Sequence, residues 1–255
     1  MPETRACAPQ CGAASEDQAS GLRRLFNRRA LRWQLVLQPT VRCAMHAQAL
    51  ADRVRDLAAH DGATLVIDAA RSQVGLPLGL RLRYDLEHVL AGDCAIADTC
   101  VRAVPELWVL PAARALDRAA ADEHHAARVA AALESVASEM RQTVLLLPAG
   151  RVAWLRHLPQ SVRPREALVP ILHNADASAA VLTAVRMAVS EAEIDTFRLL
   201  FLGMGEAAAG RLLSAMAAIA QRHFGATLLA AEALPPAGMG TSERRCRHRP
   251  VENVS

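Results

Sequence analysis

Residues 31–68 read LRWQLVLQPTVRCAMHAQALADRVRDLAAHDGATLVID, and this stretch predicts the fold. It begins with a short apolar run at 35–37 that ends before Pro39, and it closes with a second run at 64–68 that carries an acid at its carboxyl end. Between them, residues 43–60 place apolar side chains at helical spacing. Strand, helix and strand in about 35 residues form a βαβ unit. Such a unit implies parallel strands and ligand sites at their carboxyl ends.

The rest of the chain continues this alternation. Further apolar runs predict strands at 107–110, 143–147, 168–172, 197–202 and 227–229. Helical spacing predicts helices at 84–92, 115–140, 176–190 and 205–223. The pattern predicts one doubly wound α/β domain over 31–234, with a mostly parallel sheet flanked by helices. Residues 1–16 and 235–255 are small, polar and rich in Pro, Gly or Arg, and we expect disordered termini there.

The composition agrees with an α/β core and limits the chemistry. Hydrophobic residues make up 52% of the 255 residues and aromatic residues only 3%, so the core must consist of Ala, Leu and Val. The net charge of +3 is too small to indicate a nucleic-acid-binding protein. All 29 basic residues are arginine. The absence of lysine excludes a Schiff-base lysine, a lysine general base and a phosphate-binding-loop lysine.

The cysteines and the ends of the chain give little sign of a secreted or membrane protein. The spacing of the six cysteines matches no zinc motif, so we interpret them as reduced thiols, with a metal or redox role as the alternative. The N-terminus has no signal-peptide pattern, and no run of about 18 apolar residues occurs. We therefore expect a cytoplasmic location. The cysteines are Cys7, Cys11, Cys43, Cys94, Cys100 and Cys246.

Residues 17–30 precede the first predicted strand and have the pattern of a short, basic, amphipathic helix. Leu22, Leu25 and Phe26 recur at helical spacing with arginines between them. Asp17 is placed to cap the amino end of such a helix. The pattern fits a helix that binds a partner, but it also fits a helix whose basic face is simply solvated.

Three segments resemble the FlhG family of flagellar-number regulators, which are MinD/ParA-type proteins. Residues 17–23, DQASGLR, resemble the family's N-terminal DQAxxLR motif. Residues 83–94, RYDLEHVLAGDC, resemble its PKYNLSHVLSGEC segment, and residues 109–113, VLPAA, continue the match. The final strand, helix and strand, 197–229, are similar in layout. Together these segments are spread over roughly residues 17–235, which is most of the chain.

The resemblance implies a binding partner for the N-terminal segment. In the FlhG family this segment folds as a helix on the SRP-type GTPase FlhF and stimulates GTP hydrolysis. The same role here would make 17–30 a partner-binding helix, with Gln18 reaching toward the catalytic centre of the GTPase. Flagellar switch-complex proteins, a flagellar transcription regulator and recruitment to the cell pole are further expectations from the family. The implied contact residues are Asp17, Gln18, Ala19, Leu22, Arg23, Leu25 and Phe26.

The resemblance fails where the family binds ATP and Mg²⁺. The loop at 38–45 contains no glycine, and Pro39 removes a backbone donor where phosphate oxygens need one. Residues 68–70 read Asp-Ala-Ala and keep only the first acid of the family's Asp-Ala-Asp. Residues 148–150 keep a Pro-Ala-Gly turn without the acid that helps to position Mg²⁺. We expect no catalytic residue and no bound cofactor, only a site remnant: Arg42, Asp68, Pro148, Ala149 and Gly150.

The sequence leaves three hypotheses for the function of this protein. The leading hypothesis is a non-hydrolysing MinD-like protein that docks on an FlhF-type GTPase and regulates flagellum number or placement. The alternatives are an active MinD/ParA-type ATPase for polar positioning and a DNA-binding partition-type protein.

Two minor signals remain. Residues 122–125, Asp-Glu-His-His, contain metal-ligating types, but adjacent histidines on a helix point to different faces, so we expect no metal site. The arginines of 244–249 could contact anionic lipid or nucleic acid, although a short basic tail of this kind is usually solvated.

Overall fold

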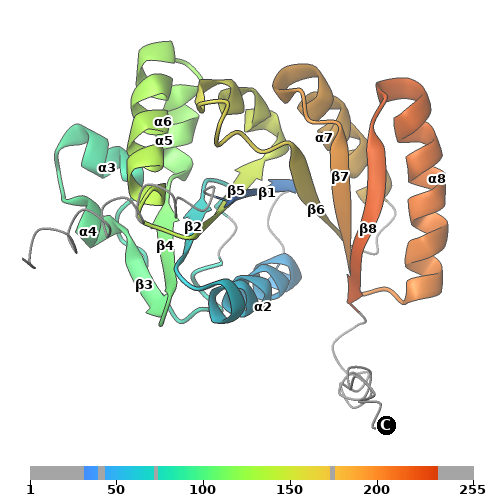
Figure 1. Ribbon diagram of the computed structural model, residues 1–255, viewed down its shortest axis with the longest axis horizontal. Helices are drawn as coiled ribbons and strands as arrows, with labels where there is room; N and C mark the ends of the chain where they lie inside the picture. The colour runs from blue at the N-terminus through green and yellow to red at the C-terminus, as the bar shows by residue number, and fades with distance from the viewer. Residues whose placement is uncertain (1–31, 40–43, 72–73, 173–175, 235–255) are drawn as a thin grey trace, which may run out of the picture.

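The computed structural model describes residues 32–39, 44–71, 74–172 and 176–234 (Figure 1). Within these ranges the chain forms an eight-stranded sheet with the order β3-β4-β2-β5-β1-β6-β7-β8. All neighbouring strands are parallel except the pair β3 and β4. The strands are β1 Arg32–Gln38, β2 Thr64–Asp68, β3 Val101–Val104, β4 Leu107–Pro111, β5 Gln142–Pro148, β6 Glu166–Leu172, β7 Thr196–Leu202 and β8 Thr227–Leu234.

Helices cover both faces of the sheet, as the doubly wound pattern predicts. Helix α2 lies on one face, while α5, α6, α7 and α8 lie on the other (Figure 1). The helices are α2 Ala44–Asp61, α3 Leu86–Ala91, α4 Ile96–Thr99, α5 Ala113–Ala119, α6 Glu123–Ala137, the 3-10 helix η1 Ala149–His157, α7 Ala177–Ala192 and α8 Glu206–Phe224.

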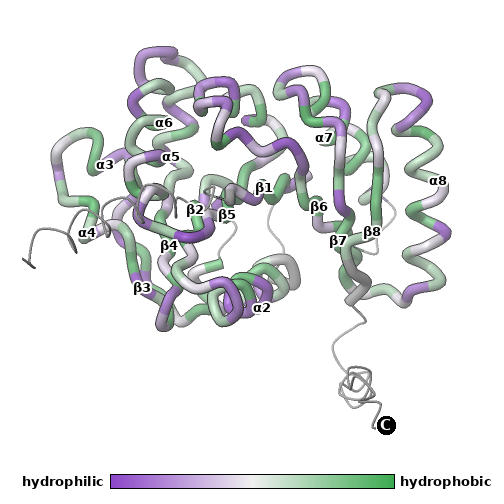
Figure 2. Tube along the Cα trace, in the orientation of Figure 1, coloured by the Kyte–Doolittle hydropathy of each residue, from purple (hydrophilic) through white to green (hydrophobic). Residues whose placement is uncertain are grey.

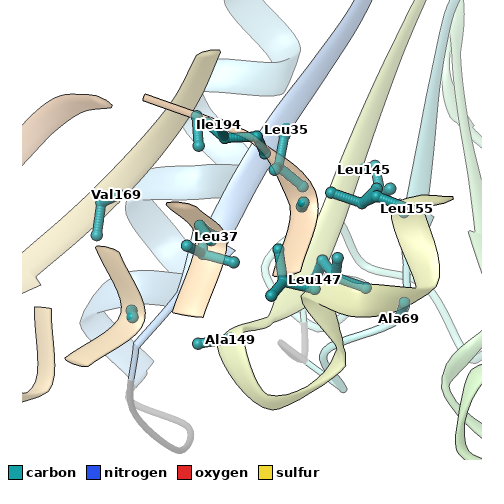
Figure 3. Packing of buried hydrophobic residues seen from close by; sticks show 14 of the residues in the cluster. Leu35, Leu37, Ala69, Leu145, Leu147, Ala149, Leu155, Val169 and Ile194 are labelled. Atoms are coloured by element: carbon teal, nitrogen blue, oxygen red, sulfur yellow. The ribbon is translucent and has the colours of Figure 1, made fainter. Parts of the chain in front are cut away.

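The central strands are apolar throughout because both of their faces are buried. In β1, Leu35 and Leu37 point to the face covered by α5 to α8, whereas Val36 points to the face covered by α2. Leu145 and Leu147 of β5 join the first cluster (Figure 3). Figure 2 shows hydrophobic residues along the central strands and hydrophilic residues mostly in the outer turns.

The predicted helix over 115–140 is wrong in one respect, because the structure divides it into α5 and α6. The break lies where Asp122 caps α6: its carboxylate accepts a hydrogen bond from the backbone N–H of His125 at 3.1 Å. Asp122 therefore begins a second helix instead of lying inside the first. A short polar side chain that bonds the backbone favours this position over a helix interior.

Three further elements were not expected. Helix α4 and strand β3 form an excursion before β4, and β3 pairs antiparallel at the sheet edge. The Arg102 guanidinium lies 5.3 Å from the ring centroid of Trp108, which stabilises this edge by a cation–π contact. After β5, the chain enters η1 directly.

Among the described helices, none is long and apolar enough to cross a membrane.

Candidate functional site

The strand order places the candidate site at the carboxyl edge of the sheet. β1 lies between β5 and β6. In the sheet, β5, β2, β4 and β3 lie on one side of β1, whereas β6, β7 and β8 lie on the other side. In open α/β sheets, ligands bind in the crevice where the strand order reverses. The carboxyl ends of β1, β2 and β5 therefore lie at this crevice.

Asp68 ends β2 at this edge. Its side chain is buried, and Oδ1 accepts a hydrogen bond from the Ala70 N–H at 3.2 Å. The next residue, Ala69, donates its N–H to the Leu146 carbonyl at 3.0 Å, which continues the pairing with β5. The structure thus places Asp68 one strand away from the turn at 148–150.

The turn after β5 lies beside the end of β1. Pro148 is in register with Gln38, and η1 begins at the following residue, Ala149. A Cβ added at Gly150 would meet no atom within 4 Å, so no described protein atom packs closely against this glycine. Gln38 is buried, and among the described residues its Nε2 has no hydrogen-bond partner.

Two arginines beside this edge share one carboxylate. Asp117 of α5 lies 2.7 Å from Nη2 of Arg71, which follows β2, and 3.3 Å from Nη2 of Arg151 in η1. Arg71 adopts a left-handed backbone conformation with φ of 50°. The Asp117 bridge connects three segments at the carboxyl edge and offsets one of the two positive charges of Arg71 and Arg151. Each exposed pair contributes at most about 1 kcal/mol to stability.

Asp85 joins two helix starts at the same edge. Its carboxylate accepts hydrogen bonds from the N–H of Glu87 at 3.1 Å, of Arg114 at 3.1 Å and of Ala115 at 3.2 Å. It therefore caps both α3 and α5. In return, Nδ1 of His88 accepts from the Asp85 N–H at 3.1 Å, which completes a capping box.

A cavity of about 390 Å³ opens between the ends of β2 and β4, and we call it the β2–β4 pocket. Asp68 and Arg71 line it on the β2 side. Arg83, Tyr84 and Arg114 line it from the segments before α3 and at the start of α5.

The sequence-predicted site residues are only partly brought together. Asp68, Pro148, Ala149 and Gly150 lie at one edge of the sheet, as described above. The predicted N-terminal helix and the predicted disordered tails lie outside the described residues. The remaining predicted site residues also lie outside them: Asp17, Gln18, Ala19, Leu22, Arg23, Leu25, Phe26 and Arg42.

Two of the four acid and histidine residues at 122–125, Asp122 and His125, have structural contacts. Asp122 caps α6, and buried His125 lies with Nε2 2.8 Å from Oε2 of Glu87, at ion-pair distance but without hydrogen-bond alignment. Within the described ranges, no group of three or more His, Cys, Asp or Glu residues is placed to hold a metal ion. Burial raises the pKa of Cys100 to about 11, and Glu139 adds to the shift, so this thiol stays protonated.

Sequence reasoning missed the Asp117 bridge and the β2–β4 pocket. The bridge joins residues 71, 117 and 151, whose contact depends on the tertiary fold. The Asp85 cap had a readable signal, because Asp-x-x-His directly before an apolar helix places a side-chain acceptor at both the N-cap and the N3 position. The second role of Asp85, capping α5, had no local signal.

The sequence matches no known family model and no curated protein. Its structure is similar to several solved structures. MinD from Aquifex aeolicus aligns with a TM-score of 0.53 and 14% identity, covering 78% of this chain and 82% of MinD. A ParA family ATPase from Chlorobium tepidum aligns at 0.52 and 14%, covering 81% and 85%. Cobyrinic acid a,c-diamide synthase from Mycobacterium smegmatis aligns at 0.51 and 14%, covering 80% and 86%.

These similarities establish the fold. The mostly parallel eight-stranded sheet with flanking helices is the MinD/ParA-type P-loop NTPase fold, as predicted from the sequence. The same fold occurs in a cell division protein, a ParA family ATPase and a cobyrinic acid a,c-diamide synthase. Function must therefore be argued from the residues of this chain.

Proposed function

We propose that this protein is a non-hydrolysing, MinD-like regulator of flagellum number or placement. It would bind an FlhF-type SRP GTPase through residues 17–30 and modulate that GTPase. The observation that carries the proposal is the DQASGLR segment at 17–23, placed shortly before β1 of this fold. Leu22, Leu25 and Phe26 supply the apolar anchors, and the Arg23 guanidinium can donate two parallel hydrogen bonds to an acid.

The carboxyl edge supports the absence of hydrolysis. ATP hydrolysis on P-loop folds depends on glycine-rich backbone donors, a phosphate-binding lysine and acids that position Mg²⁺ and water. This chain has no lysine, and its loop at 38–45 has no glycine. Asp68 is followed by two alanines, and the 148–150 turn leads directly into η1. ATP and Mg²⁺ are therefore no part of the proposed activity.

The proposed setting is the cytoplasm, with recruitment to the cell pole through the GTPase. Flagellar switch-complex proteins and a flagellar transcription regulator are further proposed partners, based on the FlhG resemblance alone. The proposal assigns no role to nucleic acid or to a membrane.

A binding and turnover experiment with an FlhF-type GTPase tests the proposal. Full-length protein should be retained in a pulldown, whereas a chain that starts at Leu31 should not be retained. A synthetic 10–32 peptide should accelerate GTP turnover. Gln18→Ala should reduce this acceleration with little loss of binding, because Gln18 is assigned to the catalytic centre of the GTPase.

Matched variants distinguish binding through the predicted apolar helix face from unspecific attraction by positive charge. Leu22→Ala and Arg23→Ala should weaken retention, because both residues lie on or beside the apolar face. Arg24→Ala removes the same charge from the side of the helix opposite to Leu22, Leu25 and Phe26, and retention should change little. If the peptide neither binds nor accelerates turnover while the intact protein does, the interface lies on the α/β domain and the assignment to 17–30 is wrong.

A further inference from the structure

Two arginines of the β2–β4 pocket form no ion pair within the part of the chain that the structure describes. Arg83 and Arg114 are exposed at its rim, and neither has an acidic partner among the described residues. The third arginine of the pocket, Arg71, differs because Asp117 pairs with it at 2.7 Å. An arginine without a protein partner retains all five of its N–H donors for a ligand.

The two carboxylates of the pocket form no direct ion pair with Arg83 or Arg114 within the described residues. Asp85 is buried, and both of its oxygens are directed at backbone N–H groups of α3 and α5. Asp68 is buried at the end of β2 and accepts from the Ala70 N–H. The guanidinium groups of Arg83 and Arg114 are therefore exposed to solvent at the rim, and the arginines of the pocket lining outnumber its carboxylates by three to two.

The position of the pocket and the chemistry of its arginines both favour a ligand that carries a phosphate group. The pocket opens at the carboxyl ends of β2 and β4, the edge of the sheet at which ligands of α/β folds bind. Arginine guanidinium groups match the oxygens of phosphate with two parallel hydrogen bonds. Tyr84 adds a hydroxyl and an aromatic ring that is 41% exposed, and the ring stands edge-on to His88 with centroids 5.7 Å apart.

We propose that the β2–β4 pocket binds a small phosphate monoester between the guanidinium groups of Arg83 and Arg114. The phosphate accepts hydrogen bonds from both arginines, and the organic part of the ligand lies against the Tyr84 ring. The pocket shares Asp68 with the site remnant, but Arg83 and Arg114 lie on the β4 side of β2, whereas the rest of the remnant lies at the ends of β1 and β5. It is also independent of the proposed GTPase binding through 17–30.

Titration calorimetry of the full-length protein at low salt tests this site, with phenyl phosphate and inorganic phosphate as probes. We expect saturable 1:1 binding of both, with phenyl phosphate tighter because of its ring. Arg83→Gln/Arg114→Gln should weaken binding by about tenfold or more, since each lost charge-assisted contact is of that order. Arg186→Gln/Arg211→Gln removes the same charge from exposed positions on α7 and α8 and should bind as the parent does.

Three results would overturn the proposal. The first is no saturable binding by the parent protein at concentrations up to about 10 mM. The second is equal weakening in both double variants, which would indicate unspecific charge attraction. The third is retained binding in Arg83→Gln/Arg114→Gln with loss in Arg42→Gln, which would place the anion at the β1 remnant.

An NMR measurement on the parent protein avoids any dependence on how the variants fold. The Nε–H signals of Arg83 and Arg114 should shift during a phenyl phosphate titration and saturate with the calorimetric affinity. Shifts confined to other arginines would contradict the site. Raising the salt concentration should weaken binding, because the charges of the pocket are solvent-accessible.

Discussion

Asp85 is the residue on which the local structure of the carboxyl edge depends most. Its carboxylate accepts three backbone hydrogen bonds from two helices. Asp85→Ala should lower the free energy of unfolding by about 2–4 kcal/mol, because it leaves buried N–H groups without acceptors. Asp85→Asn keeps one acceptor oxygen and should lose less. Urea unfolding followed by circular dichroism measures both; equal stability of all three proteins would contradict the capping role.

Asp117 provides the contrasting case at the same scale. It pairs with Arg71 and Arg151, but all three side chains are substantially exposed. Solvent screens such pairs, so Asp117→Ala should change the free energy of unfolding by no more than about 1 kcal/mol. A loss of unfolding free energy as large as that of Asp85→Ala would contradict this prediction, because solvent-exposed ion pairs contribute little to stability.

At the scale of elements, Asp122 decides where α6 begins. The backbone hydrogen bond from His125 is the main cause that lowers the pKa of Asp122 below its ordinary value. The folded state therefore favours the ionised carboxylate. Its stabilising effect is complete above the unfolded-state pKa of about 3.9 and is lost as the pH falls through the lower folded-state pKa.

This pH dependence distinguishes two substitutions. Asp122→Asn keeps a capping oxygen without charge, and Asp122→Ala removes the cap. At pH 7, Asp122→Ala should unfold at a lower temperature than the parent, with Asp122→Asn between them or close to the parent. At acid pH, below the folded-state pKa, the parent should lose its advantage over Asp122→Asn. An advantage that is unchanged at acid pH would show that the Asp122 charge does not stabilise α6.

The elements also show what could be predicted from the sequence. The strands at 64–68 and 143–147 were predictable because buried parallel strands give continuous apolar runs. The division of 115–140 was missed because alanine-rich spacing continues across Asp122 and hides its cap. β3 was missed because Val101–Val104 is short and alternates between half-buried and exposed residues. The Asp117 bridge could not be predicted, because its three residues meet only after folding.

At the scale of the whole molecule, the fold depends on a sheet buried on both faces. Val66 lies in β2 with no exposed surface. Val66→Asp would bury an unpaired charge, at a cost of several kcal/mol against a total stability of about 5–15 kcal/mol. We expect this variant to lose cooperative thermal unfolding. Val104→Asp, at a position 37% exposed in β3, is the matched control and should stay folded. A cooperatively folded Val66→Asp protein would show that β2 is not central.

The central claim is that this chain keeps the MinD/ParA-type fold without the Mg·ATP binding and hydrolysis of P-loop ATPases. Isothermal titration of the full-length protein with Mg·ATP, combined with a phosphate-release assay on the same sample, tests it most directly. We predict no ATP turnover above that of a buffer control and an ATP dissociation constant weaker than about 1 mM, a binding free energy smaller than about 4 kcal/mol. Micromolar affinity for Mg·ATP, or turnover that Asp68→Ala or Arg42→Gln abolishes, would contradict the account.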